Sequence, residues 1–160
     1  MVYFYIMKIK DDIYFMNEAL KEAKKCLLID EVPVGAIIVR DNKIIARAHN
    51  TREKNKDVTC HAEINALRKA NKKDKSWRSI NATMYVTVEP CSMCAGALVW
   101  SRIDRIVFGA YDKKAGACGS VLNITNNERL NHQIEVTPGV LEDECAKIIK
   151  DYFKAKREKK

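Results

Sequence analysis

One histidine and two cysteines limit the possible folds of this chain more than any other feature. His61 begins the stretch HAEINALRKA, and Cys91 and Cys94 lie further along the chain in EPCSMCAGAL. Two cysteines three positions apart at the start of a helix can turn both sulfurs toward one point, and His61 offers an imidazole from the start of another helix. The fold therefore has to bring the beginnings of two helices together.

Glu63 adds a second geometric condition. Residues two apart in a regular helix point to nearly opposite sides, so His61 and Glu63 cannot share a face in the middle of a helix. They converge only if the helix meets the site end-on, with its first turn above it. This orientation also directs the positive end of the helix dipole toward the thiols, which lowers their pKa values.

The donor set is typical of a zinc site, and the number of its ligands bears on function. Three protein ligands leave one position of a tetrahedral zinc ion for water, whereas a structural site closes with four. Glu63 suits proton transfer to and from that water. Two alternatives stay open, because Cys91 and Cys94 also fit a redox pair and a fourth protein ligand would make the site structural. The candidates for a fourth ligand are His49, Cys60, Cys118 and Cys145.

Hydrophobic periodicity predicts alternating helices and strands. Apolar residues recur at helical spacing over 11–29, after the pair Asp11 and Asp12, which can cap the first turn. Two β-rich runs over 34–50 join at Asp41 and Asn42, a pair typical of a tight turn, and Pro90 suits the first position of a helix. We further expect a helix over 61–70, strands over 82–88, 105–109 and 133–137, a long surface connection over 110–131 and a final helix over 141–152. This alternation indicates an α/β fold whose central sheet is covered by helices on both faces.

Composition favours one domain, residues 1–160, in the cytoplasm. The chain has 160 residues, 47% hydrophobic and 31% charged, which is enough to bury one core. No apolar run approaches the roughly 18 residues of a membrane span, so we expect no membrane partner. The six cysteines are dispersed along a chain that does not need disulfide bonds, and we expect them to be reduced.

The net charge of +8 favours a polyanionic partner. Basic residues gather at the C-terminal helix end, KDYFKAKREKK over 150–160, behind the aromatic pair Tyr152 and Phe153. Such a mixture suits phosphates and stacked loop bases of RNA, although a solvated helix end has the same composition. We select Phe153 as the stacking contact or, equally, as the last core residue of the final helix, and we expect Trp77 and Trp100 to pack in the interior.

The order of these residues matches a known signature. His61-Ala62-Glu63 followed by Pro90-Cys91-Ser92-Met93-Cys94 is the H-x-E and P-C-x-x-C pattern of zinc nucleobase deaminases. With EVPVGAIIV, the His49-Asn50 pair, EPCSMCAGAL, SRIDRIVFGA and GVLEDECAKIIKDYF, the chain resembles the bacterial tRNA-specific adenosine deaminases of the cytidine-deaminase-like superfamily over nearly its whole length.

The resemblance implies a fold, a reaction and a set of roles. The fold would be a three-layer α/β/α structure with a five-stranded mixed sheet, in a homodimer. His61, Cys91 and Cys94 would bind one zinc ion per subunit, and Glu63 would move protons as the wobble adenosine of a tRNA anticodon loop becomes inosine. The residues implied to contact the flipped base are Asn50, Val34 and Ala62.

Several features limit the transfer. Cys60 replaces the small residue expected before the histidine, residues 1–10 extend beyond the matched part, and the loop 111–120 varies. The zinc motif alone also fits a free-base or nucleoside deaminase acting on guanine, cytosine or cytidine, which would have no use for the basic helix end. A zinc-stapled RNA-binding module that is not an enzyme is a further alternative, and it would not need Glu63.

Overall fold

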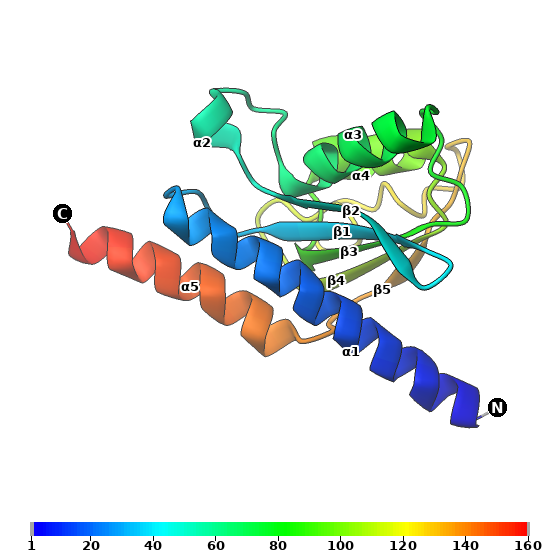
Figure 1. Cartoon of the computed structure of the whole chain (residues 1–160), viewed down its shortest axis with the longest axis horizontal. Helices are drawn as coiled ribbons and strands as arrows, with labels where there is room; N and C mark the ends of the chain where they lie inside the picture. Colours follow the sequence, from blue (N-terminus) through cyan, green and yellow to red (C-terminus); the bar gives the residue numbers. More distant parts are fainter. Residues whose placement is uncertain (1, 160) are drawn as a thin grey trace.

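The computed structural model describes the backbone of residues 2–159 and the side chains of residues 12–159. Helices and strands alternate through this part of the chain (Figure 1). The helices are α1 Val2–Lys25, α2 Arg52–Asn55, α3 Ala62–Asp74, α4 Ser92–Ser101 and α5 Glu142–Glu158, with a short 3-10 helix at Cys26–Leu28. The strands are β1 Gly35–Arg40, β2 Lys43–His49, β3 Thr83–Val88, β4 Arg105–Ala110 and β5 Glu135–Thr137.

The strands form one mixed sheet in the order β2-β1-β3-β4-β5. β1 pairs antiparallel with both β2 and β3, whereas β3, β4 and β5 are parallel to one another. The carboxyl ends of the parallel strands therefore meet at one edge of the sheet. In open α/β sheets this edge is where ligands bind.

Helices cover both faces of the sheet. In Figure 1, α3 and α4 lie on one face, and α1 and α5 lie on the other. Ile38 and Met84 belong to the core under α3 and α4, whereas Ile37 and Tyr85 belong to the core under α1 and α5. Successive residues of a strand thus enter opposite cores, and both sets are apolar because both faces are covered. The predicted three-layer α/β/α architecture with a five-stranded mixed sheet is confirmed.

Two local features explain how β1 fits between its neighbours. Asp41 and Asn42 both adopt positive φ, 52° and 59°, as the type I′ turn of a two-residue hairpin requires, so the predicted turn is confirmed. Gly35 lies against α1, where a Cβ atom would collide with the backbone of Ala19 and Ala23. The glycine therefore allows the helix to pack directly on the strand.

The sequence misplaced the start of two helices and missed a third. The first helix begins at Val2 rather than near residue 11, so Asp12 lies inside α1 and does not cap it. Pro90 precedes the fourth helix instead of opening it, because Cys91 is the N-cap residue. The short α2 was not expected, since its four residues carry no apolar periodicity.

Asp12 belongs to a buried polar network at the amino ends of β3 and β4. Its two carboxylate oxygens accept hydrogen bonds from the Arg105 guanidinium at 2.9 and 2.7 Å, and Oδ1 also accepts one from the Tyr85 hydroxyl at 2.8 Å. The Thr137 hydroxyl accepts hydrogen bonds from Arg105 Nε at 3.3 Å and, at 2.9 Å, from the same guanidinium nitrogen that donates to Asp12 Oδ2. The network ties α1 to β3, β4 and β5.

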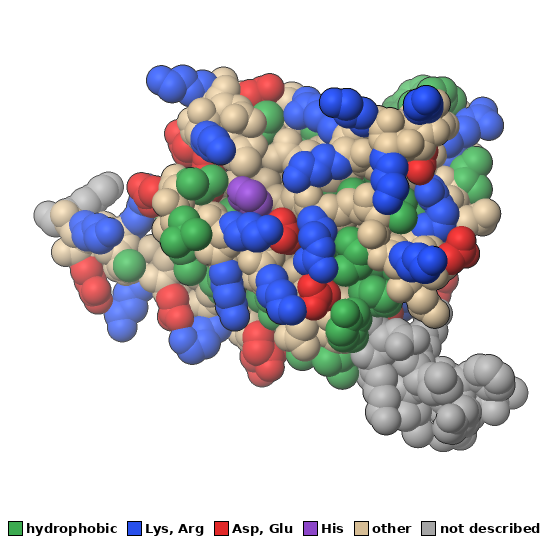
Figure 2. All heavy atoms as spheres, in the orientation of Figure 1, with side chains coloured by type: hydrophobic (Ala, Val, Ile, Leu, Met, Phe, Trp, Pro, Cys, Tyr) green, Lys and Arg blue, Asp and Glu red, His purple; other side chains and the backbone are tan. Residues whose placement is uncertain are grey.

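The described chain is helical near both of its ends, and its surface carries many charged side chains (Figure 2). The backbone of residues 2–10 continues α1, the basic helix end is helical through Glu158, and residues 1 and 160 lie outside the described part. No helix of the described residues is both long and apolar enough to cross a bilayer. Figure 2, in the orientation of Figure 1, shows Lys and Arg side chains spread over the visible surface on both sides of the sheet, with acidic side chains between them.

Candidate metal centre and active site

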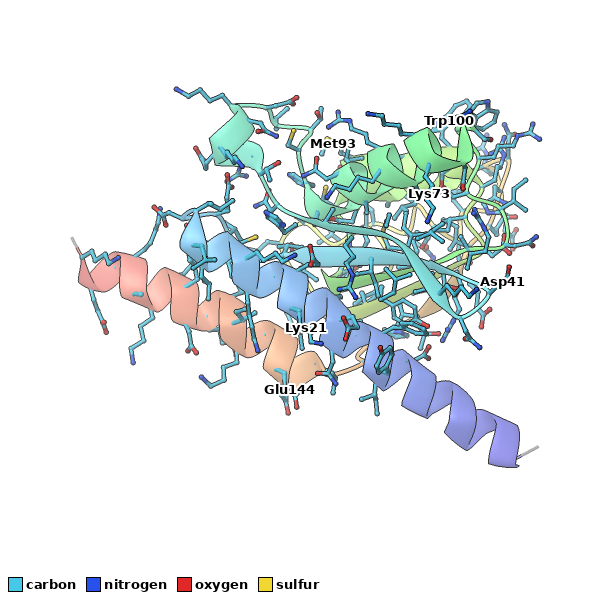
Figure 3. All side chains as sticks on the ribbon, in the orientation of Figure 1. Lys21, Asp41, Lys73, Met93, Trp100 and Glu144 are labelled. Atoms are coloured by element: carbon cyan, nitrogen blue, oxygen red, sulfur yellow. The ribbon has the colours of Figure 1, made fainter. Side chains whose placement is uncertain are left out.

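The three predicted ligands meet at the carboxyl end of β3. His61 is the N-cap residue of α3, Cys91 is the N-cap residue of α4, and Cys94 lies in the first turn of α4. Figure 3 labels Met93 in this first turn and Trp100 at the opposite end of the helix. Both helices therefore direct their amino ends toward one site, as the end-on orientation predicted.

The donor atoms lie at the separations that one tetrahedral ion imposes. His61 Nδ1 is 3.6 Å from Cys91 Sγ and 3.5 Å from Cys94 Sγ, and all three ligand atoms lie within 4.8 Å of one another. A Zn–S distance of about 2.3 Å and a Zn–N distance of about 2.0 Å require roughly 3.5 Å between nitrogen and sulfur in a tetrahedron. The three residues, which we call the ligand trio, could thus hold one metal ion.

Hydrogen bonds within the ligand trio prepare it for a cation. The hydrogen bond with Cys94 lowers the pKa of Cys91 to about 3, with a further contribution from His61 and against the effect of burial. The same interaction raises the pKa of Cys94, and the hydrogen bond with Cys91 raises the pKa of His61. Cys91 is therefore a thiolate at neutral pH, and binding of a metal would release the remaining thiol proton from Cys94.

Glu63 lies beside the trio without belonging to it. The residue is in the first turn of α3 and only 4% exposed, and it lines the same pocket as His61 and Cys91. Burial raises the pKa of its carboxyl group above the usual glutamate value. A carboxyl group whose pKa is moved toward neutrality is suited to accept and donate protons.

None of the alternative fourth ligands joins the trio among the described side chains. Cys60, next to His61 in sequence, is 4% exposed, and its sulfur lies 3.5 Å from Asn55 Nδ2 and 3.6 Å from an Arg68 guanidinium nitrogen. The candidates that also lie apart from the trio are His49, Cys118 and Cys145. All six cysteines are free of disulfide bonds. The ligand group of the described chain thus consists of three protein residues.

A pocket of about 550 Å³ opens beside the trio and Glu63. This volume lies within the range of small-molecule sites. All four residues selected from the sequence as substrate contacts line it, and these are Val34, Asn50, Ala62 and Phe153. The pocket therefore brings together side chains from six separate parts of the chain, including α5.

Asn50 is held in place by the backbone around it. Its amide nitrogen donates to the Val32 carbonyl at 3.2 Å, its amide oxygen accepts from the Arg52 N–H at 3.2 Å, and its own N–H donates to the Val34 carbonyl at 3.0 Å. The Cys26 thiol lies 3.6 Å from the carbonyl oxygens of Val34 and Asn50. An amide has two N–H donors and two lone pairs, so Asn50 keeps one of each for a ligand.

The sequence did not single out several residues that line the pocket. They are Val32, Arg52, Val88, Glu89 and Ile149. Glu89 was visible in the EPC motif, but nothing in the sequence indicated that its side chain turns toward the loop after β4. The loop residues carry no periodic pattern, so their position depends on tertiary contacts.

The basic helix end has two kinds of surroundings. Lys150 and Phe153 line the pocket, and Phe153 is 42% exposed. Lys156 instead forms an ion pair with Asp30 at 3.3 Å and lies 5.5 Å from the centre of the Tyr152 ring. One side of α5 therefore borders the pocket, while Lys156 connects the helix to the segment before β1.

Comparison with known proteins agrees with the fold and the site. The MafB19-like deaminase family matches residues 9–157. The tRNA-specific adenosine deaminase of Bacillus subtilis (strain 168) is 49% identical over 94% of this chain and 93% of its own length. A solved structure from a study of A-to-I editing by tRNA:A34 deaminases at the wobble position of transfer RNA has a TM-score of 0.82 and 41% identity, covering 84% of this chain and 98% of that chain. The guanine deaminase from Nitrosomonas europaea, with a TM-score of 0.70 and 24% identity over 86% of this chain and 81% of that chain, shares the fold.

A three-layer α/β/α fold with a mixed sheet, and a His-Cys-Cys trio beside a buried glutamate, together define a hydrolytic deaminase. Within that class, the chain belongs to the family of the bacterial tRNA-specific adenosine deaminases.

Proposed function

We propose that the protein is a zinc-dependent enzyme that converts adenosine to inosine at the wobble position of a tRNA anticodon loop. The observation that carries this proposal is the ligand trio beside buried Glu63 at the wall of a base-sized pocket. The relatives named tRNA-specific adenosine deaminase support the choice of substrate. The guanine deaminase from Nitrosomonas europaea shares the fold at only 24% identity, so this similarity does not favour the free-base alternative.

Zinc fits the donor set because two sulfurs and one imidazole nitrogen match its preferred ligands and separations. When bound to His61, Cys91 and Cys94, zinc would lower the pKa of a water molecule and make it a nucleophile at neutral pH. We infer one ion per subunit. The amino ends of α3 and α4 add positive potential, which favours negative charge at the trio and at the reacting oxygen.

Glu63 would move the protons of the reaction. Its carboxylate would take a proton from the attacking water and pass it to the purine N1. It would then take the remaining proton from the new C6 hydroxyl group and deliver it to the leaving amine. Water and adenosine are thereby converted to inosine and ammonia. Burial raises the pKa of Glu63, which helps the group to hold the proton between these two steps.

Four residues would hold the base. Asn50 has one amide donor and one lone pair for the purine edge, while Val34 and Ala62 provide apolar contacts. Phe153 offers an exposed ring from α5 on which a neighbouring base can stack. An unpaired loop base loses only its stacking when it turns into the pocket, at most a few kcal/mol.

The remaining parts of the proposal concern partners and location. We propose that the +8 charge and the helix end near the pocket bind the phosphates of the anticodon stem-loop. We further propose a single deaminase domain acting as a homodimer in the cytoplasm. Sedimentation of the purified protein over a range of concentrations tests the dimer.

An anticodon stem-loop with adenosine at the wobble position tests the substrate. The stem-loop is incubated with zinc-loaded protein and sequenced for inosine, beside free adenosine, guanine and cytidine. We expect inosine at the wobble position and no turnover of the free compounds. Turnover of a free base without editing of the stem-loop would replace the proposal by the free-base deaminase.

A further inference from the structure

Glu89 is a buried carboxylate that the proposed chemistry does not use. The residue follows β3 directly, precedes Pro90 and Cys91, and is only 2% exposed. It lines the pocket but is not part of the ligand trio. A buried charge without compensating contacts would be strongly destabilising, so the partners of Glu89 indicate its role.

The partners of Glu89 all come from the loop after β4. Oε1 accepts the backbone N–H of Asp112 at 3.1 Å and the Ser120 hydroxyl at 2.5 Å. Oε2 accepts the backbone N–H groups of Cys118 and Ser120, each at 3.1 Å. Gly116 lies against the same carboxylate, where a Cβ atom would collide with Oε2. One side chain therefore organises both ends of a loop that has no helix of its own.

The same loop forms a wall of the pocket. Tyr111, Asp112, Lys114 and Ala115 all line the cavity. Two backbone hydrogen bonds complete the connection, from Glu89 N–H to the Ala110 carbonyl and from the Ala117 N–H to the Pro90 carbonyl, each 2.8 Å. The wall is thus attached to the two residues that immediately precede the metal ligand Cys91.

We propose that Glu89 is a positioning residue that fixes the wall 111–120 relative to the ligand trio and so sets the width of the pocket for the substrate base. The inference rests on the pocket being the substrate site, as proposed above. Glu89 acts through the loop backbone, because its carboxylate oxygens are occupied by the four loop donors.

The donor pattern explains why a carboxylate is needed. Four donors and no acceptor surround the two oxygens of Glu89. A glutamine has the same shape, but its NH₂ group would face at least one backbone N–H in either orientation of the amide. Glu89→Gln therefore loses charge-assisted hydrogen bonds and places two donors against each other.

The test compares Glu89→Gln with Glu18→Gln, another buried glutamate, which pairs with Lys21 on α1 and Arg47 on β2. For Glu89→Gln we expect kcat/KM on the stem-loop to fall about 10- to 100-fold, mainly through KM, the factor that corresponds to a lost hydrogen bond to a charged group. Zinc content should stay unchanged. Amide hydrogen exchange should accelerate at Asp112, Cys118 and Ser120, whereas Glu18→Gln should change neither kcat/KM nor exchange in this loop.

Ser120→Ala provides a milder variant that keeps every backbone donor. It removes only the hydroxyl contact, so we expect a change in KM of about threefold and faster exchange confined to the loop. Amide hydrogen exchange is measured on the protein without substrate, so it tests whether Glu89 holds the loop even if the stem-loop is not the substrate. Unchanged loop exchange in both variants, or faster exchange without a change in KM, would overturn the proposal.

Discussion

The two ends of the central sheet differ in how their buried charges are compensated. At the amino ends of β3 and β4, the Asp12 carboxylate meets the Arg105 guanidinium through two hydrogen bonds. At the carboxyl end, none of the described Lys or Arg side chains pairs with Glu63 or Glu89, and Glu89 is held by backbone N–H groups instead. Matched charges at one end join elements together, whereas at the other end the loop backbone holds Glu89 and Glu63 has no Lys or Arg partner among the described residues.

The pKa shifts of Arg105 and Glu63 reflect this difference between the two ends of the sheet. Burial lowers the pKa of Arg105, but the hydrogen bonds to Asp12 and the charge interactions with Asp12 and its neighbours together outweigh this effect, so the net shift is upward. Burial raises the pKa of Glu63 because the surrounding chain offers less compensation. A charged pair thus serves stability at one end, and an incompletely compensated carboxyl group serves proton transfer at the other.

The largest expected effect follows from removing the proton carrier at the site end. Glu63→Gln keeps the shape of the buried side chain but cannot exchange protons, so we expect kcat on the stem-loop to fall about 10²- to 10⁴-fold. Zinc content and thermal unfolding should stay close to those of the unchanged protein, as measured by metal analysis and circular dichroism. Retention of more than about a tenth of the turnover would favour the zinc-stapled RNA-binding module.

Removing the Asp12 carboxylate at the opposite end of the sheet should instead lower stability and leave turnover unchanged. Asp12→Ala leaves the buried Arg105 charge with only the more distant Glu135 carboxylate, 4.0 Å away, as an anionic partner, and we expect the free energy of unfolding to fall by about 3–5 kcal/mol. Turnover measured well below the unfolding temperature should not change. The matched control is Lys147→Ala, since the Lys147–Asp151 pair is exposed and contributes about 1 kcal/mol or less. A loss for Asp12→Ala no greater than that of the control would contradict the comparison.

The smallest expected effect concerns the basic helix end. Lys150 lines the pocket, so Lys150→Ala should weaken stem-loop binding and reduce the slope of log K against log salt concentration by about 0.7, the value for one lost phosphate contact on a single strand. Lys147→Ala, on the same helix but lining the hollow between α1 and α5, should leave the slope unchanged. Equal slopes for the two variants would place the RNA elsewhere.

The site was easier to predict from the sequence than its surroundings, for a physical reason. His61, Glu63, Cys91 and Cys94 are constrained by local helix geometry, which short motifs encode, and their end-on arrangement is confirmed in part by the two N-cap positions. The helix α2 depends on a contact with a distant residue instead. The buried Glu31 carboxylate accepts a hydrogen bond from the Lys54 backbone N–H in the first turn of α2, at 2.6 Å. No local sequence pattern predicts this contact.

The surface shows the same limit of prediction. Trp77 and Trp100 were expected in the interior, but they are 55% and 68% exposed, so that prediction was wrong. Each ring lies near an arginine, Arg78 at 4.8 Å and Arg102 at 5.9 Å from the ring centre. Aromatic character alone predicts burial, but the position of a residue in a loop or on the outer side of a helix depends on packing that the sequence does not display.

X-ray absorption at the zinc edge tests the central claim most directly. For purified protein we predict about one zinc ion per chain, bound by two sulfurs at about 2.3 Å, one imidazole nitrogen and one further light-atom ligand that no protein side chain supplies. The spectrum of Cys60→Ser should be the same. A third sulfur, or a second imidazole, would show a closed structural site and would contradict the account of catalysis.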